Sequence, residues 1–200
     1  MKDSRKVALW LQWTGVLSGL CFAAGRVLSL DSGTKPLVGL MGLLFVLFTV
    51  ASFAVGAVWL RRSRANAELL APGSQPFGSG LATAGWLVPG LSIVLRWPLM
   101  LGLWRGSGVR GAPVLIHLWW GASLATTVLG VLTQAHVLGS AAGLTATGLN
   151  LLHSVLFAVA VRLITARQVE ALDLPPARPE PDAPAPENRA QEQRADSVTP

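Results

Sequence analysis

The chain has 200 residues, of which 52% are hydrophobic and only 13% are charged, about half the charged fraction of an average soluble domain. A soluble protein of this length cannot bury so much apolar surface, so the composition excludes an ordinary soluble domain and indicates a membrane protein. The 16 basic and 10 acidic residues give a net charge of +6. The arginines flank apolar runs and form no continuous basic face, which excludes a nucleic-acid-binding protein.

The first apolar run covers residues 7–25 and has the length of a membrane-spanning helix. The basic start "MKDSRK" and the small residues "FAAG" are also typical of a cleaved signal peptide, but the run is longer than the apolar part of such a peptide. We therefore expect an uncleaved first span. Cys21 follows Leu20, whereas a lipoprotein cleavage site has Gly, Ala or Ser before the cysteine, so we interpret Cys21 as a small apolar residue within the span.

Three further runs, at residues 36–60, 112–134 and 138–164, are also long and apolar enough to cross a bilayer. None of the four runs contains Asp or Glu. Because backbone groups inside a bilayer must be satisfied internally, each run predicts a helix. The sequence thus predicts an all-α integral membrane domain over residues 1–168, with four transmembrane helices.

The segment 85–104, "GWLVPGLSIVLRWPLMLGLW", is long enough to span but contains Pro89, Pro98 and Arg96. Both prolines interrupt a helix, and an arginine at a helix centre costs about 2.5–3.5 kcal/mol on insertion scales. If the segment does not span and the N-terminus is cytoplasmic, eleven basic residues before the tail lie on the cytoplasmic side against two, Arg26 and Lys35. If it spans, the count is six against six. We therefore predict an interfacial or re-entrant segment between the second and third spans.

Three tryptophans of this segment, Trp86, Trp97 and Trp104, suit the headgroup boundary, where a ring is half buried and its N–H stays wet. Arg96 would then extend towards lipid phosphate. The alternative is a polar ligand site in a broken helix, as in transporters, which would involve Pro89, Arg96, Asn150 and His153.

The order of several motifs resembles the domain of unknown function 4328 family of bacterial membrane proteins, over most of residues 36–168. The motifs are Trp59, "RRSRAN", "GWLVP", "LWRGS", the pair Trp119-Trp120 and "ITARQ". Where the family has an Asn-Leu-Trp-x-Pro element, this chain has Ser92, Val94 and Arg96 at the Asn, Trp and Pro positions. The resemblance implies a bacterial membrane protein and no particular chemistry. Its motif and interfacial residues are Asn66, Gly85, Trp86, Pro89, Arg96, Pro98, Trp104, Arg105, Trp119, Trp120 and Gln168.

Small or polar residues recur every four positions along the last span, which predicts close helix packing. They are Ala142, Ala146, Asn150, Ser154 and Ala158, and the first span has Gly15 and Gly19 at the same interval. Packing within one chain explains this pattern, and a homo-oligomer is the alternative.

No catalytic or cofactor-binding motif is present, and Ser154 and His153, as sequence neighbours, point to different sides of a helix. His117 and His153 would lie at depths that differ by about 9 Å, at 1.5 Å per residue, so one metal ion would not readily bind both. We expect no enzyme, no cofactor and no metal, and histidines that form structural hydrogen bonds.

Residues 169–200 are rich in proline and acidic residues and predict a disordered cytoplasmic tail. The tail is either a docking segment for protein partners or a solvated terminus. Taken together, the sequence favours a structural or interaction protein of the bacterial inner membrane, with both termini cytoplasmic and the lipid bilayer as its main partner. The alternative is a small transporter or ligand-binding membrane protein with a polar site around residues 85–104.

Overall fold

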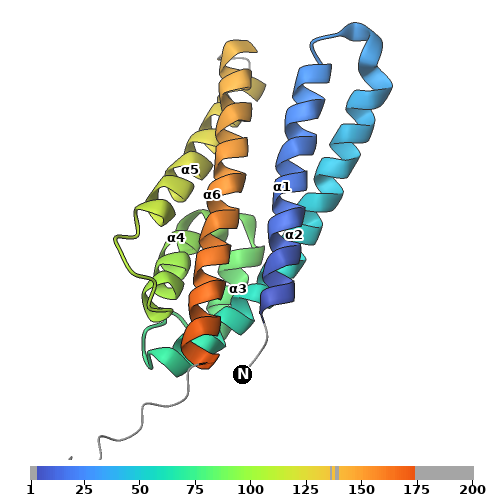
Figure 1. Cartoon of the computed structure of the whole chain (residues 1–200). Coiled ribbons are helices and arrows are strands. Elements are labelled where there is room, and N and C mark those ends of the chain that lie inside the picture. The colour runs from blue at the N-terminus through green and yellow to red at the C-terminus, as the bar shows by residue number, and fades with distance from the viewer. Residues whose placement is uncertain (1–3, 136, 138–139, 174–200) are drawn as a thin grey trace, which may run out of the picture.

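The computed structural model of the chain describes residues 4–135, 137 and 140–173, and these residues form an all-helical bundle. The expected disordered tail covers residues 169–200; residues 169–173 are instead helical and form the end of α6, whereas residues 174–200 lie outside the described residues. In the described part the helices, shown in Figure 1, are α1 (Arg5–Leu28), α2 (Lys35–Leu70), α3 (Ser79–Leu87), α4 (Pro89–Gly106), α5 (Val114–Gln134) and α6 (Ser140–Asp173), with a short 3-10 turn, η1 (Ser32–Thr34), before α2.

Four of these helices, α1, α2, α5 and α6, are long and apolar enough to cross a membrane, which confirms the predicted fold class. Two of them continue beyond the predicted apolar runs, α2 to Leu70 and α6 to Asp173. The extensions are held by buried residues such as Ala67 and Gln168, which pack inside the bundle. Packing of these residues therefore helps to keep the chain helical beyond the apolar runs.

The spans form two hairpins, α1–α2 and α5–α6, and α1 packs against α6 between them. Arg5 Nη2 lies 3.0 Å from Asp173 Oδ2, so the start of α1 and the end of α6 meet at one end of the bundle. We call this the terminal end. The turn η1 and the end of α5 lie at the opposite end (Figure 1).

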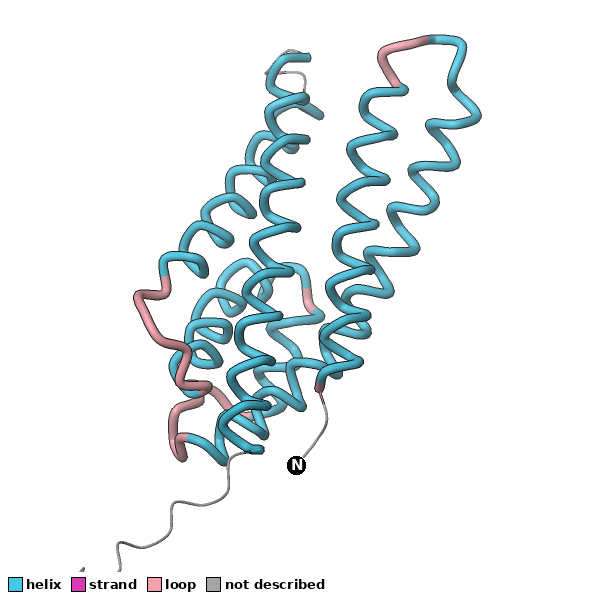
Figure 2. The backbone as a smooth tube through the Cα atoms, viewed as in Figure 1, coloured by secondary structure: helices cyan, strands magenta, loops and turns pink. Residues whose placement is uncertain are grey.

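Helices α3 and α4 form a short hairpin that stays in the terminal half of the bundle (Figure 2). Val88 is extended, with φ −87° and ψ 118°, and separates the two helices. The hairpin returns to its starting point, because a Cβ added to Gly102 of α4 would lie 2.7 Å from Pro76 Cδ, in the loop before α3. The chain therefore enters and leaves at the same end, as expected of a re-entrant segment.

The predicted interruption at Pro98 is wrong, since this residue lies inside α4. The interruption predicted at Pro89 is present, because the break falls between Leu87 and Pro89, the last residue of α3 and the first of α4. A proline at the first position of a helix replaces an N–H that has no helical acceptor anyway. Inside α4, Pro98 removes one backbone hydrogen bond, which helices packed within membrane bundles tolerate.

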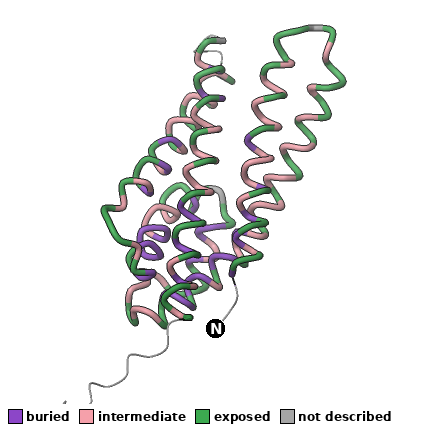
Figure 3. The backbone as a smooth tube through the Cα atoms, in the orientation of Figure 1, coloured by how far each residue is buried: buried purple, intermediate pink, exposed green. Residues whose placement is uncertain are grey.

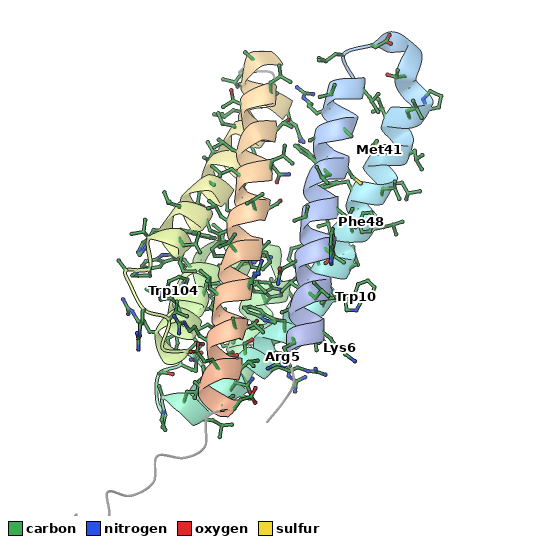
Figure 4. All side chains as sticks on the ribbon, in the orientation of Figure 1. Arg5, Lys6, Trp10, Met41, Phe48 and Trp104 are labelled. Carbon is green, nitrogen blue, oxygen red and sulfur yellow. The ribbon has the colours of Figure 1, made fainter. Side chains whose placement is uncertain are left out.

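Most of the buried residues lie in the terminal half of the bundle (Figure 3), and the buried core cluster includes residues of every described α-helix. Trp59 of α2, with no exposed surface, and Trp119 of α5, with 1%, are the largest. The outer faces of the spans are apolar and exposed: Trp10 is 66% exposed and points away from the bundle in Figure 4. Such outer faces fit a lipid surrounding.

Candidate functional site

A cavity of about 390 Å³ lies between the helices, and every described α-helix contributes to its wall. Its lining includes the middle residues of α1, α2 and α6, so it lies near the middle of the predicted spans. The polar lining residues are Ser18, Thr49, Ser52, Arg96, Thr127, Asn150, His153 and Ser154. Four α2 residues, Phe45, Thr49, Ser52 and Phe53, line the cavity at the spacing of one helix face.

Arg96 of α4 points into this cavity. Its Cζ lies 4.7 Å from the ring centroid of Phe53 and 5.0 Å from that of Trp86, so two aromatic rings flank the guanidinium. Its Nη2 donates to the carbonyl oxygen of Trp86 at 3.2 Å, at the end of α3. The cation therefore stabilises the last turn of α3, where unpaired carbonyls gather.

Arg96 has more hydrogen-bonding capacity than the bundle uses. A guanidinium has five N–H donors, and within the described residues Trp86 O is the acceptor that Arg96 contacts, while Nε is buried without a partner. The two ion pairs among the described residues, Arg5–Asp173 and Arg167–Glu170, do not involve it. The charge of Arg96 thus has no carboxylate partner in the described part of the chain.

Aromatic rings form one wall of the cavity. The ring of Trp119 stacks on His153 with centroids 5.8 Å apart and on Phe157 at 5.5 Å, and Phe157 in turn contacts Trp86 at 5.9 Å. His153 Nδ1 donates to Trp119 O at 3.4 Å. A neutral His153 would therefore have Nε2 available as an acceptor.

Small polar groups of α1, α2 and α6 also line the cavity. The hydroxyls of Ser18 and Thr49 are 2.7 Å apart and join α1 to α2, whereas Ser154 Oγ donates to Asn150 O within α6. The side-chain amide of Asn150 makes no hydrogen bond to any residue that the structure describes. This amide is therefore available to a ligand.

The structure brings together many of the residues that the sequence singled out. Those that line the cavity are Gly15, Gly19, Trp86, Arg96, Trp119, Asn150 and Ser154. Gly19 lies directly at the α1–α6 contact, because a Cβ there would be 2.7 Å from Ser154 Oγ. Of the remaining packing candidates in α6, Ala146 is buried, whereas Ala142 and Ala158 are half-buried.

Other predicted residues lie away from the cavity. Asn66 and Gln168 are buried near the terminal end, and Gln168 Nε2 donates to Ser63 O and Ser107 Oγ, both at 2.8 Å. Gly85 packs against Leu95 within the hairpin. Pro89 begins α4, Pro98 lies within it, Arg105 is exposed in its last turn, and Trp120 is half-buried beside Trp119.

The expected place of the tryptophans and of Arg96 at the headgroup boundary differs from the structure. Trp86 is only 4% exposed and Trp104 only 5%, and their indole N–H groups are buried. Trp97 is half-buried, with its ring edge against His117. The physical reason is that the α3–α4 hairpin packs against the spans, so these side chains contact other helices and not lipid.

Some residues that line the cavity were not predicted from the sequence, among them Thr49, Ser52, Phe53 and Phe157. The helical spacing of the α2 residues was an available signal, but serine, threonine and phenylalanine are ordinary members of apolar spans. Within the described residues, no three or more His, Cys, Asp or Glu side chains lie close enough together to bind a metal ion. His117 Nδ1 donates instead to Pro113 O at 2.7 Å.

Comparison with known proteins gives one result. A family model described as Domain of unknown function (DUF4328) matches residues 31–174, which include α2 to α6 and the hairpin with Arg96. Neither the curated proteins nor the solved structures contain a match to the chain.

Proposed function

The chain belongs to the DUF4328 family, and from that premise we propose that it is a bacterial membrane protein that binds a small organic anion in the cavity around Arg96. The sequence alone favours a structural or interaction role. The inward direction of Arg96 supports the ligand-binding alternative instead, with Arg96, Asn150 and His153 on the wall of the same cavity. Binding, with or without transport, is the activity that we propose, and not catalysis.

The single observation that carries this proposal is the uncompensated charge of Arg96. Removing a cation from water is costly unless it is paired. The two flanking rings offset part of this cost, about 2 kcal/mol for a desolvated cation–π contact. An anion in the cavity would offset more, because Coulomb attraction is strong where water is scarce. An ionisable residue within a membrane bundle is by default a functional-site hypothesis.

The shape and polarity of the cavity favour an anion with an apolar body. The aromatic wall of Trp119, Phe157 and Trp86 offers apolar and π surface, while Asn150 and His153 supply hydrogen-bonding groups. A volume of about 390 Å³ is in the range of pockets for small organic molecules. Metabolites with a carboxylate or phosphate group on a short apolar chain fit this description.

The distribution of basic residues supports an orientation with the terminal end in the cytoplasm. The basic residues at or near that end are Arg5, Lys6, Arg61, Arg62, Arg64, Arg105, Arg110, Arg162 and Arg167. Arg26 and Lys35 lie near the opposite end. Cytoplasmic loops of membrane proteins carry such an excess of basic residues. We therefore propose that both ends of the described chain lie on the cytoplasmic side of a bacterial inner membrane.

A ligand series tests the anion site. Thermal unfolding of the purified protein in detergent is measured with octanoate, octyl phosphate, octanol and octyltrimethylammonium, which share an apolar chain and differ in charge. We expect one or both anions to raise the Tm. At a ligand concentration a hundredfold above Kd, binding adds about 2.7 kcal/mol to the free energy of unfolding. Octanol and the cation should have no such effect.

Variants assign the effect to Arg96. Arg96→Gln should abolish the stabilisation by the anion and Arg96→Lys should retain part of it, because the lysine keeps the charge but not the planar fork. Arg105→Gln, in the same helix and exposed, is the matched control and should respond as the wild type does. The proposal is overturned if no anion raises the Tm, or if Arg96→Gln responds as strongly as the control.

A further inference from the structure

A second recess, of about 400 Å³, lies at the terminal end between the last turns of α2 and the start of α3. Its wall includes Arg61, Arg64, Glu68, Gln75, Gly78 and Ser79. None of these residues lines the cavity around Arg96. The two sites are therefore separate.

The N-terminus of α3 opens into this recess. Gly78 is the N-cap of this nine-residue helix, and no side chain caps its first N–H groups. The first internal acceptor is Gly78 O, which receives the N–H of Ala82 at 3.0 Å. The preceding N–H groups of the first turn have no helical acceptor, and together with the helix dipole they attract an anion.

Arg64 supplies an independent observation at the same place. It is only 9% exposed and donates through Nη2 to the carbonyl oxygen of Phe77, the residue before the N-cap of α3. Its Nη1 is buried and has no partner among the described residues. A buried, incompletely paired guanidinium thus lies beside an uncapped helix N-terminus.

The neighbouring charges leave the recess positive. Arg61 is exposed and lines the same wall. The carboxylate of Glu68 also lines it, but its Oε1 accepts the N–H of Gly73 at 2.7 Å, and it forms no ion pair with either arginine. Two guanidinium groups and a helix N-terminus therefore oppose one carboxylate that is already hydrogen-bonded.

We propose that this recess binds a phosphate group. Phosphate has the charge and the geometry for paired N–H donors of arginine, and a helix N-terminus is a common phosphate site. On α2 the recess begins at Arg61, directly after the apolar pair Trp59-Leu60. Basic residues that follow an apolar span are expected near lipid headgroups. The phosphate comes either from a membrane phospholipid or from a soluble phosphate compound.

The test uses three probes that separate these sources. Binding to the purified full chain in detergent is measured by thermal shift and by native mass spectrometry with dioctanoyl phosphatidylglycerol, inorganic phosphate and dioctanoylglycerol, which lacks phosphate. We expect binding of phosphatidylglycerol, of inorganic phosphate or of both, and none of dioctanoylglycerol. Binding of the lipid alone assigns a headgroup site, whereas binding of inorganic phosphate as well assigns a general phosphate site.

Variants locate the binding. Arg64→Gln should weaken phosphate binding at least tenfold, and Ser79→Asp should weaken it by repulsion. An acidic residue in the first turn of a helix favours that helix, so the second variant is informative even if Arg64→Gln unfolds. Arg105→Gln, which removes an exposed cation from the same end, is the control for nonspecific attraction.

Arg96→Gln should bind phosphate as the wild type does, which separates this proposal from the one on the cavity. Failure of both phosphate compounds to bind would overturn the proposal. Equal binding by the wild type and by Ser79→Asp would also overturn it.

Discussion

Arg96 shows what a single residue of this sequence does and does not reveal. Its position in the middle of an apolar segment marks it as unusual, and the spacing of Asn150 and His153 predicts a shared face of α6. The direction of its side chain was not predictable. Whether Arg96 contacts lipid phosphate or the interior depends on how the α3–α4 hairpin packs against the spans, and this packing leaves no mark in local composition.

Gly56 illustrates packing at the residue scale. A Cβ at this α2 position would lie 2.6 Å from Trp86 Nε1 and 2.8 Å from its Cζ2, and the rigid indole cannot move away within the core. We expect Gly56→Ala to destabilise the protein by about 1–3 kcal/mol, the usual cost of overpacking. Thermal unfolding in detergent measures the loss.

The matched control for this substitution is Gly42→Ala in the same helix, where nothing lies within 4 Å of an added Cβ. Both substitutions gain the same helix propensity, up to about 1 kcal/mol for glycine to alanine, so their difference isolates the steric effect. Equal Tm values for the two variants would contradict the contact between Gly56 and Trp86.

At the scale of elements, the sequence locates the four spans because long apolar runs have few other solutions. The sequence does not predict the helix boundaries within residues 85–104 as well. Pro89 and Pro98 look alike in the sequence, yet one begins α4 and the other lies inside it. The difference arises because Val88 is extended and separates the two helices, whereas the helix around Pro98 is held by buried neighbours such as Leu99 and Met100.

The path of the α3–α4 hairpin makes a prediction about sidedness. In a Cys21→Ser background, Pro72→Cys and Arg110→Cys flank the hairpin, and both positions are exposed. A membrane-impermeant maleimide should label both from the same side of the membrane, and Leu30→Cys, near η1, from the opposite side. We expect the first two to react only after cells are lysed. Labelling of Pro72→Cys and Arg110→Cys from opposite sides would mean that the hairpin crosses the membrane.

At the scale of the whole molecule, burial is uneven. The buried cluster lies in the terminal half (Figure 3). In the other half, α1 and α6 contact each other through the Arg26 side chain, which lies against Gly143. Segments with few buried contacts open most easily. Among the described residues, the two hairpins therefore have a firmly packed terminal end and an opposite end with fewer buried residues, which we call the weakly packed end.

This asymmetry predicts a difference in motion that spin labels can measure. In the same Cys21→Ser background, Leu30→Cys paired with Ala135→Cys reports on the weakly packed end, and Lys6→Cys paired with Arg110→Cys reports on the other; all four positions are exposed. Double electron–electron resonance should give a broader distance distribution for the first pair. Distributions of equal width would show that the two ends are equally rigid.

The contact between Trp86 and Phe157, with centroids 5.9 Å apart, has a consequence for the synthesis of the protein. Phe157 belongs to α6, the last described helix to leave the ribosome, so the α3–α4 hairpin is made long before its partner exists. Until α6 is inserted, the cavity beside the hairpin lacks the wall that Asn150, His153 and Phe157 supply, whereas Phe53 and Trp86, the two rings that flank Arg96, are already made. A chain that stalls after α5 would therefore leave Trp86 without its contact to Phe157, although α2 and α5, which also pack against the hairpin, are already made.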